Sequence, residues 1–396
     1  MYKTKEEALP KGTIEQYYDY HGPLEKAVRV AQHYGFHLVP PTKPEKKNRE
    51  PNAGVWYISP KEKERSLKYY KSKLHKRPHP VKVCYTLHHR RKVGNIKLEI
   101  FGCKKSIAEA LLLRTALAIL TDHKHKHLHI DINSRGCRNS SETFLEEYKN
   151  YYRKHANKIP QCCQTKLRNN PLELAFCGNG ECSKIRESAP RSIAFLSEGD
   201  RVHLKEVIEY IESMSVPYCI NSQLVGPHEE AHPKTLFQIK SLKKKRGGEI
   251  KSSTIVARGE RFDYLTYDKE EEENENHAVS ISIDIPAGKY ESYKELDDEE
   301  VQEPNIYFVH ISAEAKRESL PLLEELRKKN IQVRQALMRD SLWQQMRHAE
   351  HLGIPYVVIL GLQEVKEREV IVRNLETQAQ ETVPFSKLAK HLKKIA

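Results

Sequence analysis

The clearest pattern of hydrophobic and polar positions lies in the C-terminal part of the chain, where short apolar runs alternate with charged stretches. Leu320, Leu323 and Leu326 recur at helical spacing, which places them on one face of a helix. Alternating strands and helices indicate crossover connections and a parallel sheet. The pattern predicts an α/β domain over 304–396 that ends in two further strands and a terminal helix. The apolar, strand-like runs span 305–312, 331–338 and 356–361.

The chain before residue 304 places strand-like runs directly after one another. Consecutive strands favour hairpins, as at the basic turn 243–249, and hence an antiparallel sheet with packed helices. A polar stretch over 138–216 predicts a helical insertion in this sheet. The expected strands span 81–91, 96–103, 218–221, 235–242, 253–265 and 277–285, with a turn at 93–95. Residues 22–39 are expected to form a helix that enters a strand, and residues 107–120 a further helix.

A domain boundary is indicated by charge. Two acidic runs, 268–275 and 295–300, flank the strand expected over 277–285. Charge runs are usually loop segments, and Pro304 ends the second one. We therefore expect a sheet domain over 1–303 and the α/β domain over 304–396.

Composition narrows the class of protein. A chain of 396 residues is too long for one ordinary core, so several domains are expected. The formal net charge of +13 attracts polyphosphate partners, of which nucleic acid is the first candidate. The longest apolar run, 110–120, is interrupted by Arg114 and is shorter than the ~20 residues of a membrane span. The N-terminus lacks the apolar core of a secretory signal, so we expect a cytoplasmic protein without a membrane segment.

Two groups of residues are candidate metal ligands. With eight cysteines and no signal peptide, we expect reduced thiols or metal ligands rather than disulfides. Cysteines at 162, 163, 177 and 182 could close a tetrahedral zinc site, although their spacing differs from the usual C-x2-C. Histidines at alternate positions over 123–129 would share one face of a strand and could bind a metal; alternatively, they form a solvated loop before the strand-like run 128–133. The zinc candidates are Cys162, Cys163, Cys177 and Cys182, and the alternating residues are His123, His125, His127 and His129.

The segment 253–265 carries a more specific signal. Its residues Gly259, Arg261, Phe262 and Asp263 resemble the histidine-specific element of the histidyl-tRNA synthetases, a class II aminoacyl-tRNA synthetase family in which a glycine-rich turn precedes Arg-Tyr-Asp. Further segments resemble the same family in order along nearly the whole chain, most specifically after residue 304. They span 11–44, which resembles the dimer-forming motif 1, then 132–137, 167–177, 188–198, 216–225, 235–239, 322–361 and 370–384.

The resemblance implies a class II synthetase-like antiparallel sheet domain with a helical insertion, followed by an α/β anticodon-binding domain. That family activates histidine with ATP and transfers it to tRNA, which requires cations fixed against phosphate. Bidentate arginines suit this task better than lysines. The resemblance thus implies tRNA as partner and a homodimer as assembly, with ATP and Mg²⁺ used if ligase activity is retained. Pocket-like positions would be Gly259, Arg261, Phe262, Asp263, Glu229 and Thr235.

The equivalent of motif 2 departs from the family pattern. The family grips the α-phosphate with an arginine that a glutamate follows. Here Arg90 or Arg91 stands in that place, no glutamate follows, and the connecting loop is shorter. Upstream, Lys61 replaces the carboxylate that binds the histidine amino group, and a cation repels an ammonium. Glu62 is the nearest substitute.

The equivalent of motif 3 and the segment 224–239 also differ from the family. No arginine appears over 277–293, where Lys289 is the nearby cation. In the family an arginine follows the Leu-Val pair and polarises the histidine carboxylate, but here Gly226 and Pro227 follow. Removing one electrostatic donor typically costs ~10²–10³ in rate. The four departures together predict that ordinary histidine activation is lost.

Three functions follow from these observations. The preferred one is a histidyl-tRNA synthetase-like protein that binds tRNA or related RNA without ordinary aminoacylation. The alternative is a divergent active histidine–tRNA ligase that uses Arg90 or Arg91, Lys289 and Arg261. A further alternative is a regulatory subunit like the synthetase-like partner of ATP phosphoribosyltransferase, against which the retained C-terminal domain speaks.

Basic residues of the α/β domain are the candidate RNA contacts. Trp343 lies among them in the sequence, but we interpret it as a core residue of its helix rather than a stacking platform. The basic segment 240–248 is interpreted as a solvated hairpin tip, with RNA contact as the alternative. The candidates in the α/β domain are Arg334, Arg339, Arg347, Lys366 and Arg373.

Overall fold

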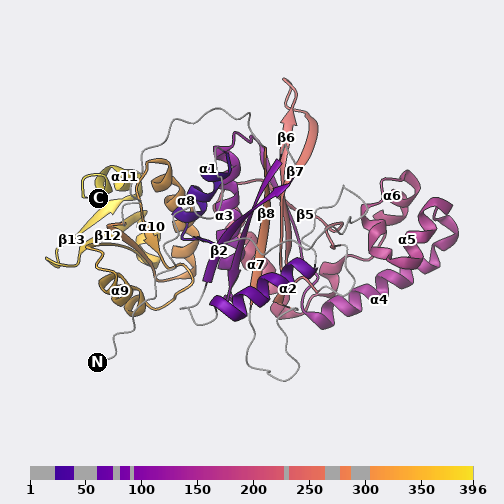
Figure 1. The fold of residues 1–396 in the computed structure, drawn as a ribbon, viewed down its shortest axis with the longest axis horizontal. Coiled ribbons are helices and arrows are strands. Elements are labelled where there is room, and N and C mark those ends of the chain that lie inside the picture. Colours follow the sequence, from indigo (N-terminus) through magenta and orange to yellow (C-terminus); the bar gives the residue numbers. More distant parts are fainter. Residues whose placement is uncertain are drawn as a thin grey trace.

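The computed structural model of the chain describes residues 23–39, 60–74, 81–89, 93–226, 232–263, 277–286 and 304–395. Within these ranges an eight-stranded sheet and a five-stranded sheet form the centres of two units that lie side by side (Figure 1). The expected α+β class is confirmed. The expected boundary between residues 303 and 304 adjoins an undescribed range and stays a prediction. Among the described helices, none is long and apolar enough to cross a membrane.

The larger sheet is mostly antiparallel, as expected. Its strand order is β1-β2-β3-β8-β7-β6-β4-β5, and only the edge strands β1 and β5 pair parallel with their neighbours. The strands are β1 (His37–Leu38), β2 (Val81–His89), β3 (Val93–Phe101), β4 (Leu128–Asn133), β5 (Tyr218–Ile220), β6 (Leu236–Lys244), β7 (Ile250–Arg261) and β8 (Ala278–Pro286).

The turn expected at 93–95 is wrong, because these residues begin β3. Val93 pairs with His89 of β2 and with Pro286 of β8. The amide of Asn95 donates to Asp284 of β8 at 3.0 Å, which fixes this end of the ladder. Turn-forming residue types were therefore outweighed by pairing on both sides of the strand.

Alternation along β3 separates an apolar face of the sheet from a polar one. Ile96, Leu98 and Ile100 are buried in the main core, which α3 also fills, whereas Lys97 and Glu99 point to the opposite face. The apolar face is covered by α1 (Pro23–His33), α3 (Ile107–Asp122) and α7 (Glu198–Ser213). On the polar face lie α2 (Pro60–Tyr69) and the following turn η2 (Tyr70–Leu74), whose Tyr70 ring stacks on Phe101.

Where a helical insertion was expected, over 138–216, the structure has a run of helices with its own small core. It projects from the large sheet on the side away from the C-terminal unit (Figure 1). Its elements are α4 (Arg138–Lys154), η3 (Ala156–Lys158), η4 (Gln161–Cys163), α5 (Gln164–Asn169), η5 (Pro171–Phe176), α6 (Gly180–Glu187) and η6 (Ser192–Phe195), and α7 leads back to β5.

The C-terminal unit has the strand order β10-β9-β11-β12-β13. β9, β10 and β11 pair parallel, as expected from the alternation, while β12 and β13 complete the sheet antiparallel. The elements are β9 (Ile306–His310), α8 (Ala313–Lys328), β10 (Arg334–Gln335), α9 (Leu342–His351), β11 (Tyr356–Leu360), α10 (Leu362–Glu367), β12 (Glu369–Asn374), β13 (Gln380–Pro384) and α11 (Phe385–Leu392).

The strand expected over 331–338 is only two residues long, at β10. The side chain of Gln335 accepts a hydrogen bond from the backbone N–H of Leu337 at 2.9 Å, which turns the chain out of the ladder. Leu337 still reaches the core. The apolar pattern over 331–338 thus indicated correctly that Leu337 is buried, but it did not predict the length of the strand.

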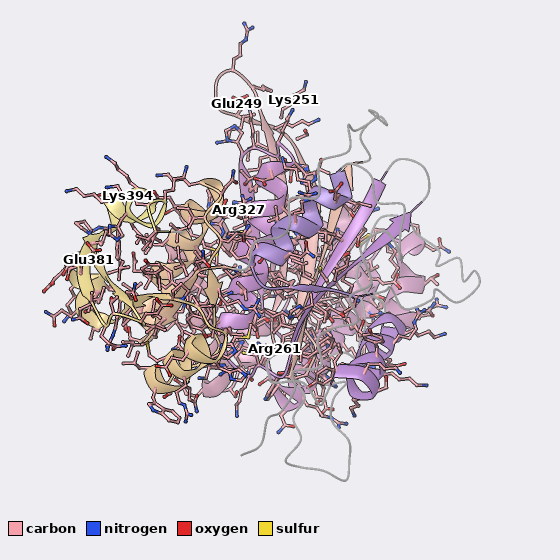
Figure 2. All side chains as sticks on the ribbon, turned by 60° about the vertical axis from the view of Figure 1, so that its left-hand side comes forward. Glu249, Lys251, Arg261, Arg327, Glu381 and Lys394 are labelled. Carbon is pink, nitrogen blue, oxygen red and sulfur yellow. The ribbon has the colours of Figure 1, made fainter. Side chains whose placement is uncertain are left out.

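Of the two alternatives for the histidines over 123–129, a shared face of one strand is wrong. His123 caps the C-terminal end of α3, and positive φ angles at Lys124 and His127 turn the chain before β4 begins at Leu128. His129 is the member of the row that lies in a strand. The solvated-loop interpretation is confirmed. The basic hairpin tip is likewise exposed and stands away from the body, near Glu249 and Lys251 (Figure 2).

The two units meet through α8, which contacts α3 and α7. Arg327 of α8 forms a bidentate ion pair with Asp122, at 2.9 and 3.0 Å, and lies at the junction of the units (Figure 2). The hydroxyl of Tyr34 donates to Glu324 at 2.7 Å in the buried part of this contact. The C-terminal unit therefore docks on the helical layer and leaves the polar face of the large sheet on the far side.

Candidate functional site

The polar face of the large sheet carries ionisable side chains in adjacent strands. Glu99 pairs in register with Ser280, which pairs with Glu260, and Lys97 lies one step along the same face. All four side chains are buried. A buried charge is costly unless it is paired, so the partners of these groups determine what the face can bind.

The buried charges of this face pair with one another. Lys63 of α2 forms an ion pair with Glu260 of β7, and both side chains are less than a tenth exposed. The Lys63 ammonium also lies 6.0 Å from the centre of the Phe262 ring. Beside them the Lys97 ammonium lies 3.0 Å from Glu99. Both lysines thus already have an acidic partner in the protein, and α2 closes over part of the face.

Glu109, a carboxylate in the mostly apolar α3, contacts side chains from several elements at the edge of this region. It accepts hydrogen bonds from Arg261 at 2.5 and 2.7 Å, from Thr235 at 2.9 Å, and it contacts the His203 ring at 2.8 Å. Burial alone would raise the pKa of Glu109, but the Arg261 and His203 charges and their hydrogen bonds hold it well below its usual range. Glu109 is therefore ionised in the folded protein.

Arg261 is enclosed by protein groups. Besides Glu109, its guanidinium donates to the backbone carbonyls of Cys103 at 2.9 Å and Lys105 at 3.2 Å, and the side chain is fully buried, in the interior of the molecule (Figure 2). Burial lowers the pKa of Arg261, yet Glu109 and Asp263 raise it above its usual range. This arginine holds α3, β7 and the loop after β3 together.

The other pocket-like positions have structural contacts. Gly259 lies within β7 rather than in a turn, and a Cβ there would come within 2.4 Å of the Ser280 carbonyl oxygen, so the strand contact requires glycine. Phe262 is fully buried beneath α2. Asp263 accepts the backbone N–H of Ala278 at 2.9 Å. The structure therefore brings Thr235 and Arg261 to Glu109, and Asp263 to Arg261. Four other candidates lie outside the described residues: Arg90, Arg91, Glu229 and Lys289.

Sequence reasoning missed Glu109 and Lys63. A lone acid in an apolar helix that is buried almost all round is a usable signal, because such a residue is rarely buried without a partner. Lys63 gave no comparable signal, since it lies in a segment crowded with exposed lysines and glutamates.

A second candidate surface lies on α9 in the C-terminal unit. The interpretation of Trp343 as a core residue is wrong, because its side chain is 64% exposed. The Arg347 guanidinium carbon lies 4.8 Å from the centre of the Trp343 ring. The buried side chains of this helix are instead those of Gln345 and Ala349, on its inner face. A shallow hollow on this surface is lined by Arg339, Trp343, Gln344, Arg347, His348 and His351; we call these residues the α9 surface.

The RNA candidates do not all lie on the α9 surface. Arg339 and Arg347 belong to it, and Arg334 pairs in register with Tyr307, whose hydroxyl contacts His348 at 3.0 Å. Burial raises the pKa of Tyr307 to about 12, against the opposing influence of Arg339 and Arg334 nearby. Lys366 lies apart, on α10, which packs with α8 and β12. Arg373 of β12 bonds to Gln378 in the next turn.

Two clusters of possible metal ligands occur among the described residues. One joins Cys163, Cys177 and Cys182 of the insertion, next to Cys162. The other joins His129, Asp131 and Cys219, but there the Lys240 ammonium lies 2.5 Å from Asp131 and occupies the place of a cation.

Comparisons with known proteins agree with the sequence resemblance. Residues 305–395 match the family model described as anticodon binding domain. The chain is 26% identical over 326 residues to the histidine–tRNA ligase of Dehalococcoides mccartyi, covering 82% of this chain and 75% of that one. It is 28% identical over 298 residues to the histidine–tRNA ligase of Aquifex aeolicus, covering 75% and 70% of the two chains.

Two solved structures are similar along most of the chain. Apo histidyl-tRNA synthetase of S. aureus aligns with a TM-score of 0.46 at 20% identity, covering 98% of this chain and 99% of that one. An ATP phosphoribosyltransferase regulatory subunit/histidyl-tRNA synthetase from Bacillus halodurans C aligns with a TM-score of 0.39 at 12% identity, covering 86% and 92%.

Proposed function

Because the chain belongs to the histidyl-tRNA synthetase family and carries its anticodon-binding domain, we propose that it binds tRNA or a related RNA through residues 304–396 and has lost ordinary histidine activation. We propose that the protein is cytoplasmic. We also propose a homodimer, because residues 11–44 resemble the dimer-forming motif of that family. A solution mass equal to one chain by light scattering would contradict the dimer.

The α9 surface supports RNA binding. An exposed tryptophan with an arginine over its ring offers two flat surfaces on which unpaired bases stack. Arg334, Arg339 and Arg347 add positive charge for the phosphates around it. A solvent-exposed Trp343 contributes little to the core, so its exposure is better explained by a partner.

We expect Trp343→Ala to weaken binding of a histidine tRNA transcript by about 1–3 kcal/mol, or roughly 5- to 150-fold, because one stacked base is lost. Fluorescence anisotropy of labelled tRNA measures the change. Leu342→Ala is the control, since Leu342 is an exposed apolar residue next to it on α9. Equal affinities of the two variants would contradict a stacking role.

Arg347→Ala should weaken binding and also reduce the slope of log affinity against log salt by about one, as expected for a lost phosphate contact. Titrations at several salt concentrations measure this slope. Lys329→Ala, at the C-terminal cap of α8, is the control of equal charge, and it should leave the slope unchanged because α8 contacts the large sheet domain. An unaltered slope in Arg347→Ala would remove this arginine from the interface.

The observation that carries the loss of activation is the buried Lys63–Glu260 pair. A triphosphate and a histidine require open cations and acids, but these two groups neutralise each other beneath α2. Arg261 likewise donates its described hydrogen bonds to acceptors within the protein. Gly226, where the family arginine is expected, has a φ of +75°, a conformation that a side chain would strain. The acids of this face are therefore poorly placed to hold Mg²⁺ with ATP.

We expect no histidine-dependent exchange of pyrophosphate into ATP above the level measured without histidine. The histidine–tRNA ligase of Aquifex aeolicus, assayed alongside, shows that the conditions support exchange. A robust rate with this chain would establish the alternative, a divergent ligase that uses ATP and Mg²⁺ with Arg90 or Arg91 and Lys289. Stimulation of an ATP phosphoribosyltransferase without tRNA binding would instead favour the regulatory-subunit alternative.

A further inference from the structure

The helical insertion brings cysteines from three separate elements to one point. Cys163 ends η4, Cys177 follows η5, and Cys182 lies in the first turn of α6. Their sulfur atoms all lie within 4.8 Å of one another, and the side chains are 4%, 5% and 1% exposed. The sulfur of Cys162 lies 3.7 Å from that of Cys163, at the exposed edge of the group. We call these four residues the cysteine cluster.

The spacing of the sulfur atoms distinguishes between two kinds of thiol chemistry. A disulfide requires about 2.05 Å between sulfurs. In a tetrahedral zinc site with bonds of about 2.3 Å, neighbouring sulfurs lie about 3.8 Å apart. The observed distances are 3.5 Å from Cys163 to Cys177 and 3.7 Å from Cys162 to Cys163. These distances exclude a disulfide and are short enough for the sulfurs to share a metal ion.

We propose that the cysteine cluster binds a structural zinc ion, with Cys163, Cys177 and Cys182 as three ligands and Cys162 as the fourth. Cys162 needs only a side-chain rotation, because it is exposed and adjacent in the chain to a ligand. Four protein ligands close the coordination sphere, which is the arrangement of a structural site rather than a catalytic one.

A backbone donor and two cations lie beside the Cys177 sulfur and its loop. The backbone N–H of Asn179 donates to the Cys177 sulfur, and Lys166 lies nearby. Arg186 donates to the Cys177 carbonyl at 2.9 Å and fixes the loop that carries it. A zinc ion with four thiolates has a net charge of −2, which these cations and the N-terminal end of α6 offset.

The fold of the insertion explains what the ion would do. The short helices η4, η5 and α6 surround a small core, and small units of this kind commonly require a metal or disulfides to be stable. The ion would join all three elements. The turn from Cys177 to Cys182 passes through Gly178 and Gly180, beside which the described atoms leave open space, so the loop can adjust to a ligand.

The first test is the metal content of the full-length chain, purified from cells grown with zinc and measured by plasma mass spectrometry. We expect one zinc per chain that survives dialysis. After replacement with Co²⁺, we expect the intense visible absorption of tetrahedral cobalt with four thiolates. A chain without stoichiometric metal, or one that holds an iron–sulfur cluster instead, would overturn the proposal.

The second test assigns the ligands. Cys177→Ser should lose the metal, while Cys219→Ser, an exposed cysteine outside the cluster, should keep it. Cys177→Ser can also unfold the insertion, so Cys162→Ser is the decisive variant. Because the Cys162 side chain is exposed and is not needed for packing, this variant should stay folded. Its cobalt absorption bands should shift to those of a site with three thiolates. Unchanged bands in Cys162→Ser would remove it as the fourth ligand, and retained metal in Cys177→Ser would refute the site.

Discussion

Glu109→Gln is expected to destabilise the large sheet domain by about 3–5 kcal/mol, because the substitution removes the nearer of the two acidic partners of the buried Arg261 and leaves only Asp263, at 3.5 Å. Glutamine has nearly the same size, so little of the effect comes from packing. The lost contacts join α3 to β7 and to Thr235, residues that lie far apart in the chain. The whole domain, rather than one loop, should become less stable.

Hydrogen exchange of backbone amides in α3 and β7 measures this effect within the domain, which avoids assuming that a chain of several units unfolds in one step. The control is Glu25→Gln, since Glu25 pairs with Arg29 at 2.7 Å on the exposed side of α1. An exposed pair of this kind contributes about 0–1 kcal/mol. Similar losses of protection in both variants would mean that the Glu109–Arg261 pair has no special role.

The pH dependence follows from the lowered pKa of Glu109. The folded pKa lies below the unfolded one, so the contribution to stability is fully present above the unfolded pKa and is lost as the pH falls through the folded one. As the pH falls below about 4, the ordinary pKa of a glutamate, wild-type stability should therefore decline more steeply than that of Glu109→Gln. Parallel declines would contradict this assignment.

Local patterns predicted the elements well because each depends on neighbouring residues. Alternation along β3 and the apolar α3 gave the antiparallel sheet and its covering helix, since burial of one face requires that spacing. The strand over 331–338 failed for a local reason, the hydrogen bond from Leu337 to the Gln335 side chain. The prediction that Trp343 is a core residue failed for a different reason. An aromatic residue on a short helix is compatible with either face of the helix, and the sequence does not show which face packs on the sheet.

The candidate site was harder to predict, because its contacts join residues that lie far apart in the sequence. Departures from the family motifs indicated which arginines and carboxylates of the family pattern differ in this chain. They did not show that Lys63 and Glu260 form a buried pair on the polar face. The partner of Arg261 lies 152 residues before it, and the partner of Glu260 lies 197 residues before it. The cysteines were recognised by type, but their spacing in the sequence did not show that three separate elements bring them together.

The Lys63–Glu260 pair should show a strong coupling between its two members. Lys63→Met alone leaves Glu260 buried without a partner and should cost about 3–5 kcal/mol, whereas Lys63→Met with Glu260→Leu removes both charges and should lie within about 1 kcal/mol of the wild type or be more stable. Hydrogen exchange of backbone amides in β7, completed as a double-mutant cycle, measures the coupling energy within the domain.

The matched control for this cycle is the exposed pair Lys245–Glu249 at the hairpin tip, 3.0 Å apart, for which the coupling should be close to zero. If the face beneath α2 were an open histidine pocket, Lys63 and Glu260 would be hydrated and their coupling would resemble that of the hairpin pair. A large coupling would instead mean that the two groups are sealed from water and held by each other. In that case the charges that a substrate would need are already committed to the fold.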